Sequence, residues 1–133
     1  MLKGGARFLM WYGAIDGRSG GDLGIAPKHV RVEQICLASS RDGVHWKKKN
    51  GGRPVMPLGK KGTVDSLQVT GMHILRIREK GRTVYRMWYG AYTGAHRLAV
   101  AESPGGLKWH RRTGGPPVPS PPLALPTKAA GQR

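Results

Sequence analysis

The chain has 133 residues, which is enough for one domain and too few for two. Its hydrophobic share of 38% is low while Gly 21 and Pro 10 are high, a composition that favours short strands and turns over long helices. Lys and Arg number 23 against 7 Asp and Glu, so the formal net charge of +16 attracts polyanions, but the basic residues are dispersed and form no basic arm.

The cysteine count and the hydropathy of the chain further restrict the classes of protein to which it could belong. Cys36 is the single cysteine, which excludes an intramolecular disulfide and a cysteine-based metal site, and its apolar neighbours indicate a buried position. No apolar run approaches the roughly 20 residues that span a membrane, and no signal-peptide core is visible. We therefore expect no membrane association, no cofactor and no metal, and the sequence assigns no compartment.

The first predicted elements in chain order belong to a repeat unit. Residues 10–17 read Met-Trp-Tyr-Gly-Ala-Ile-Asp-Gly and residues 87–94 read Met-Trp-Tyr-Gly-Ala-Tyr-Thr-Gly, so six of the eight positions are identical. A second block follows each copy, at 35–46 and at 98–109, with the same pattern of small residues and a terminal tryptophan. The first copy carries a Gly-rich insertion at 18–28. Two blocks that recur in the same order indicate a repeat protein.

The second copy predicts four strands in succession. They are expected at 69–78, 83–92, 97–103 and 107–111. The segment 83–92 is apolar on both alternating faces, which is typical of a strand buried between two layers. The first copy shows three strands that end with a closing strand at 44–48, so we expect its opening strand to lie before Met1 and the chain to be a truncated piece.

The sequence therefore predicts an all-β fold, a partial β-propeller of about one and three-quarters four-stranded antiparallel blades. The expected propeller domain covers 1–112, with blade one at 6–49, an inter-blade loop at 50–68 and blade two at 69–112. Residues 113–133 are Pro-rich, and we expect a disordered tail. The four tryptophans stand at matching positions of the two copies, which favours a place between blades over sugar stacking.

A family resemblance follows from the order of these motifs. Met-Trp-Tyr-Gly is followed by Leu-Ala-Ser-Ser-x-Asp-Gly-x-x-Trp, a Pro-Val stretch and Gly-x-x-Asp-Ser before a His-Ile-Leu strand. Over roughly residues 8–112 this resembles the five-bladed arabinanase/levansucrase/invertase superfamily of glycosyl hydrolases. The resemblance implies a five-bladed propeller that hydrolyses or transfers glycosyl units, furanosides especially, at the mouth of its channel. Such chemistry needs two carboxylates that face each other across the sugar.

The resemblance suggests two site residues. Asp65 matches an acidic position just ahead of a blade's inner strand, which makes it the candidate catalytic carboxylate; ordering of the inter-blade loop is the alternative. His73 lies on that inner strand and is the candidate substrate-binding residue; an ordinary half-buried histidine is the alternative. Related sequences often carry Asp-Pro before this histidine, whereas Gly71 and Met72 stand here. Of the other acids, Asp42 is expected to serve a turn and Glu102 a surface salt bridge.

Three functions stay open on the sequence. The first is a glycosyl hydrolase-like fragment that binds or acts on carbohydrate and is inactive as an isolated chain, because two blades lack a full set of carboxylates. The second is a non-catalytic module that self-associates through exposed blade faces into an oligomer. The third is a basic protein that binds nucleic acid, for which the sequence supports only non-specific contact through net charge.

Overall fold

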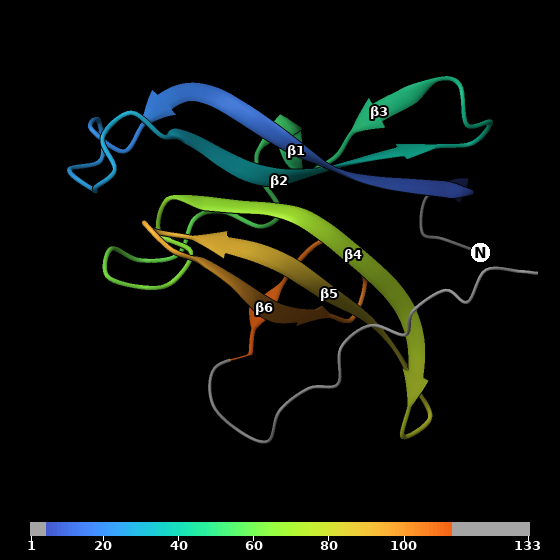
Figure 1. The fold of residues 1–133 in the computed structure, drawn as a ribbon. Coiled ribbons are helices and arrows are strands. Elements are labelled where there is room, and N and C mark those ends of the chain that lie inside the picture. Colours follow the sequence, from blue (N-terminus) through green and yellow to red (C-terminus); the bar gives the residue numbers. More distant parts are fainter. Residues whose placement is uncertain (1–4, 113–133) are drawn as a thin grey trace, which may run out of the picture.

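The computed structural model describes residues 5–112, which form an all-β structure with two groups of strands (Figure 1). The strands in chain order are β1 Phe8–Ser19, β2 Arg31–Ser40, β3 Trp46–Lys48, β4 Gln68–Glu79, β5 Arg82–Tyr92, β6 His96–Ser103 and β7 His110–Arg111, with one 3-10 turn, η2 Asn50–Gly52, after β3. None of the helical segments within these described residues is both long and apolar enough to cross a membrane.

The two groups are the two repeat units. In blade one (β1–β3), β2 pairs antiparallel with β1 and with β3. In blade two (β4–β7), each strand pairs antiparallel with the next, which makes a four-stranded meander. A short parallel pairing of Glu33 with Gln68 joins β2 to β4, and Figure 1 shows blade one lying against blade two. The predicted all-β partial propeller is confirmed for the described residues.

The blades meet along an apolar core. Its buried members come from β2, the segment after η2, β4, β5 and β6: Ile35, Leu37, Val55, Met56, Val69, Met87, Tyr89, Ala91 and Ala101. In β5, Met87 and Tyr89 point into this core while Trp88 points to the other face, because successive side chains of a strand alternate. Both faces of this stretch of β5 are buried, as the sequence predicts for 83–92.

Two local features differ from a regular meander. The β4–β5 register shifts between Thr70 and His73, and Gly71 in that bulge has φ +57°, a conformation that glycine adopts without a Cβ penalty. The closing strands are shorter than the predicted 44–48 and 107–111. In blade one the reason is local, because Asp42 accepts hydrogen bonds from the backbone N–H groups of Val44 and His45 and holds them in the turn. The predicted tail, 113–133, lies outside the described residues.

Candidate functional site

Asp65, the candidate catalytic residue, lies in the loop just before β4 and is 1% exposed. Its Oδ2 accepts a hydrogen bond from the Tyr89 hydroxyl at 2.8 Å and pairs with Arg111 Nε at 2.6 Å. Its Oδ1 accepts a bond from the Thr63 hydroxyl at 3.2 Å. The carboxylate therefore ties three parts of the chain together: its own loop, the buried strand β5 and the closing strand β7.

The surroundings of Asp65 change the chemistry of its neighbours. Burial, and then the hydrogen bond to the Asp65 carboxylate, raise the pKa of Tyr89 well above its ordinary value. Arg111 also donates a hydrogen bond to the carbonyl of Pro57, so one guanidinium holds both Asp65 and the loop after η2. These contacts satisfy the buried carboxylate and give it a loop-ordering role. A catalytic role for Asp65 stays a prediction.

His73, the candidate substrate-binding residue, lies on β4 with an exposed side chain. It is paired with Trp88 of β5, and the two ring centroids are 6.2 Å apart. Asp65 contacts Tyr89, whose side chain leaves β5 on the opposite face from Trp88. The structure therefore places the two predicted site residues on opposite faces of blade two and does not bring them together. Substrate binding by His73 stays a prediction.

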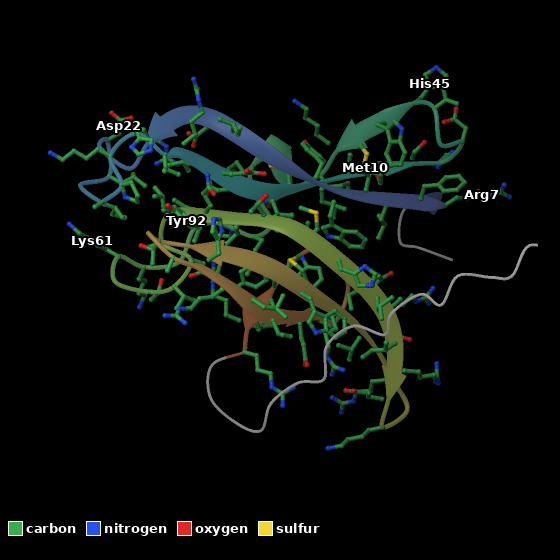
Figure 2. All side chains as sticks on the ribbon, in the orientation of Figure 1. Arg7, Met10, Asp22, His45, Lys61 and Tyr92 are labelled. Atoms are coloured by element: carbon green, nitrogen blue, oxygen red, sulfur yellow. The ribbon has the colours of Figure 1, made fainter. Side chains whose placement is uncertain are left out.

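Three connecting segments meet at one end of the sheets, which we call the mouth end: the β1–β2 loop 20–30, the loop 57–67 and the β5–β6 turn 93–95. Figure 2 shows Asp22, Lys61 and Tyr92 at this end, and Arg7 and His45 at the other. A Cβ on Gly94 would lie 3.9 Å from the Ala26 carbonyl, so the turn of blade two contacts the loop of blade one.

The mouth end carries a small polar and aromatic group. The rings of Tyr92 and His96 lie 4.6 Å apart across the β5–β6 turn. Directly beside Tyr92, Thr93 accepts a hydrogen bond of 2.8 Å from the Ser66 hydroxyl, which fixes the turn to the start of β4. His96 is exposed and Tyr92 is partly exposed, so both rings are accessible. Sequence analysis did not single out this pair. The signal that could have found it is a break in the repeat, because the position of Tyr92 in the second copy is Ile15 in the first.

All seven acidic residues of the chain fall within the described residues, and each has a partner. Arginine pairs with Asp16, Asp65, Glu79 and Glu102; histidine pairs with Asp42; hydroxyl or backbone donors bind Asp22 and Glu33. The pKa of Asp42 is held well below its usual range, first by the hydrogen bond from His45 and then by backbone N–H groups. The expected turn role of Asp42 and ion pair of Glu102 are both confirmed.

A basic hollow lies at the end opposite the mouth, around the β2–β3 hairpin. It has a volume of about 570 Å³, and its lining includes Ser39, Arg41, Asp42, His45, Lys47 and Lys49, so cations outnumber the one carboxylate. The described residues contain no group of three or more His, Cys, Asp or Glu side chains that could hold a metal ion. The hollow therefore offers positive charge and hydroxyl groups to a ligand.

Comparison with known proteins identifies two sequence relatives and one solved structure with a similar fold. The chain is 32% identical over 111 residues to Rv1502 and to MT1551, two uncharacterized proteins of Mycobacterium tuberculosis, across 84% of this chain and 32% of theirs. A solved glycosyl hydrolase from Bacteroides ovatus superposes with a TM-score of 0.59 at 23% identity, across 83% of this chain and 29% of that one. The described residues therefore share the fold of the matched part of that protein. The chain spans about a third of the length of these relatives, and no family model matches it.

Proposed function

We propose that this glycosyl hydrolase-like chain forms two adjacent blades of a five-bladed propeller that binds carbohydrate at its mouth end and does not hydrolyse glycosidic bonds by itself. The engagement of all seven acidic residues supports the absence of hydrolysis most directly. Glycoside hydrolysis needs two carboxylates that flank the scissile bond of the same sugar. Here the most deeply buried carboxylate, Asp65, holds Tyr89 and Arg111.

Carbohydrate binding is proposed for the mouth end because both blades supply loops there and because its rings are accessible. The paired rings of Tyr92 and His96 offer an apolar face beside polar groups, which suits a sugar ring with its apolar face and hydroxyl rim. His73, five positions along β4 from Gln68, would lie roughly 16 Å from the start of that strand and would serve a longer ligand.

The test is calorimetric titration of the purified chain with arabinan and levan oligosaccharides, joined to an assay for release of reducing sugar. We expect a dissociation constant on the order of 1 mM and no release. Tyr92→Ala should abolish binding and His73→Ala should weaken binding of longer oligosaccharides, while His45→Ala, an exposed histidine at the opposite end, should leave it unchanged. Sugar release by the wild-type chain contradicts the non-catalytic part, and the absence of any binding contradicts the carbohydrate part.

The basic hollow supports a second candidate function, the binding of polyanions. Arg41, Lys47 and Lys49 line it, and none of the three pairs with an acidic residue of the described chain. Binding to single-stranded DNA that falls steeply as salt rises, and that Lys47→Ala with Lys49→Ala weakens, favours this function. Binding that those two substitutions leave unchanged contradicts it.

A further inference from the structure

Asn50 is the single asparagine of the chain, and two glycines follow it directly. The three residues form η2, the turn at the start of the inter-blade loop. All three have positive φ angles, of +57° for Asn50, +64° for Gly51 and +79° for Gly52. Asparagine and glycine tolerate this left-handed backbone better than other residues. None of the three is buried, so the Asn50–Gly51 step is open to water.

An asparagine followed by glycine deamidates without an enzyme or an oxidant. The backbone nitrogen of the glycine attacks the side-chain carbon Cγ, so that a bond from nitrogen to Cγ forms and the bond from Cγ to Nδ2 breaks. The proton of the glycine N–H ends on the ammonia that departs. Glycine favours this step because it has no Cβ to hinder the approach. Water then opens the cyclic succinimide at either carbonyl, which gives aspartate or isoaspartate.

The attacking nitrogen of the Asn50–Gly51 step is free. Within residues 5–112 the structure gives the N–H of Gly51 no hydrogen-bond partner, whereas the N–H of Gly52 donates to the Lys49 carbonyl at 3.0 Å. The attack requires that the Gly51 N–H lose its proton, and a nearby cation stabilises the negative charge that results. Arg53 supplies that cation, since its Nε donates to the Asn50 carbonyl at 3.4 Å. Both features favour reaction at this step.

Two other steps in the described residues, Asp16–Gly17 and Asp42–Gly43, join an acidic residue to glycine, and contacts protect both. At Asp42–Gly43 the nitrogen is engaged, because the glycine N–H donates to Ser40 Oγ at 2.8 Å. At Asp16–Gly17 the carboxylate is engaged, because Arg18 pairs with it at 2.7 Å. An ionised carboxylate is also a poor electrophile, whereas the side-chain amide of Asn50 carries no charge. Asn50 is therefore the reactive member of the three.

In the native turn the Asn50 amide fastens the start of the inter-blade loop. Its Nδ2 donates to the carbonyls of residues 53 and 54, at 3.4 and 3.1 Å. The next two residues, Val55 and Met56, are buried, and the N–H groups of both donate to the Ile35 carbonyl of β2, at 2.9 and 3.1 Å. A carboxylate has no N–H to donate, so deamidation leaves the two carbonyls without this donor and places a negative charge beside them.

We propose that Asn50 is a modification site, converted through a succinimide with Gly51 to aspartate and isoaspartate, and that the conversion loosens the attachment of the inter-blade loop to blade one. Isoaspartate has the larger effect, because it inserts the side-chain methylene into the backbone and shifts the turn. The loop continues to Pro57, whose carbonyl binds Arg111, the partner of Asp65. A change at Asn50 therefore acts on the segment that leads to the buried carboxylate.

Peptide mass spectrometry of the purified full chain, aged in buffer at neutral and at alkaline pH, tests the modification. We expect the peptide that contains Asn50 to convert to both aspartate and isoaspartate, and to convert faster at alkaline pH because the attacking nitrogen must be deprotonated. Isoaspartate identifies the succinimide route, since direct hydrolysis of the amide gives aspartate alone. The absence of isoaspartate at residue 50 at both pH values overturns the proposal.

Gly51→Ala and Gly52→Ala form a matched pair of variants. Both glycines have positive φ, and no atom lies closer than 3.8 Å to a Cβ added at either, so alanine strains the turn to a similar degree at both positions. Gly51→Ala places the Cβ beside the attacking nitrogen and should lose isoaspartate formation over the same incubation. Gly52→Ala places it one residue later and should convert as the wild type does. Equal conversion of the two variants overturns the proposal.

Amide hydrogen exchange measures the loosening of the loop. Asn50→Asp supplies the aspartate product in uniform form, and the aged wild type supplies the mixture that contains isoaspartate. The N–H groups of Val55 and Met56 should exchange about fivefold faster in Asn50→Asp than in the fresh wild type, the effect of losing one hydrogen bond, and faster in the aged chain too. Met87, buried in blade two, is the control and should exchange at an unchanged rate. Unchanged exchange of Val55 and Met56 in both samples overturns the loosening.

Discussion

Replacing Asp65 with asparagine isolates the charge at the centre of the inter-blade network. Asparagine keeps an oxygen that can accept the Tyr89 hydroxyl bond but leaves Arg111 without its anion. Removing one partner of a buried ion pair costs about 3–5 kcal/mol. The Arg111 side chain is 28% exposed, so water recovers part of the loss, and we expect the free energy of unfolding to fall by about 2–3 kcal/mol.

The assay is urea unfolding followed by circular dichroism, with the unfolding free energy compared across variants. Asp16→Asn is the matched control, since Asp16 and Arg18 form an exposed pair at 38% and 48% exposure, and it should change the free energy by less than about 0.5 kcal/mol. Adding Arg111→Met to Asp65→Asn should recover part of the loss, because the unpaired cation is then gone. An Asp65→Asn variant as stable as Asp16→Asn refutes the reasoning.

Three further predictions follow from single contacts. Trp11→Phe should lower the unfolding free energy by about 1 kcal/mol through loss of the bond to Gly106, as measured by urea unfolding, whereas Trp46→Phe should cost less because its bond is local and exposed. The thiol of Cys36 is 4% exposed and burial raises its pKa, so it should react slowly with a thiol reagent in the native chain and rapidly in urea; equal rates contradict its burial. The pKa of Tyr89 is raised, so the stability that the protonated Tyr89 hydroxyl contributes is fully present below about pH 10. That stability is lost as pH rises through the pKa of Tyr89 in the folded state. A titration of phenolate absorbance in which all four tyrosines ionise near pH 10 contradicts this prediction.

The repeat made much of the fold predictable. Matching blocks around Trp11 and Trp88 place the strands, because alternation and turn residues are local properties of the chain. The prediction that tryptophans build the blade interface is confirmed for Trp11, which lies between the blades. The short closing strand of blade one could not be predicted from the repeat. The Asp42 side chain accepts hydrogen bonds from backbone N–H groups that would otherwise pair with the neighbouring strand.

The candidate site was harder to predict from the sequence, because the residues that contact each other there are far apart along the chain. Asp65 was singled out by its position before a strand, but its partner Arg111 is 46 positions away and reads as part of a basic pair. The Tyr92–His96 pair arises from a turn geometry that composition does not encode. Whether a carboxylate is free for chemistry depends on the cation that reaches it in three dimensions, and here an arginine reaches Asp65.

The central claim is that the chain packs as two successive blades joined by Trp11. Nuclear Overhauser contacts measured on the isotope-labelled chain test it most directly. We expect contacts from the Trp11 indole to the rings of Tyr85 and Trp109, and a Trp11 indole N–H protected from exchange by its bond to Gly106. Intact strands with no such contacts, and an indole N–H that exchanges as fast as that of a solvent-exposed tryptophan, would contradict the account.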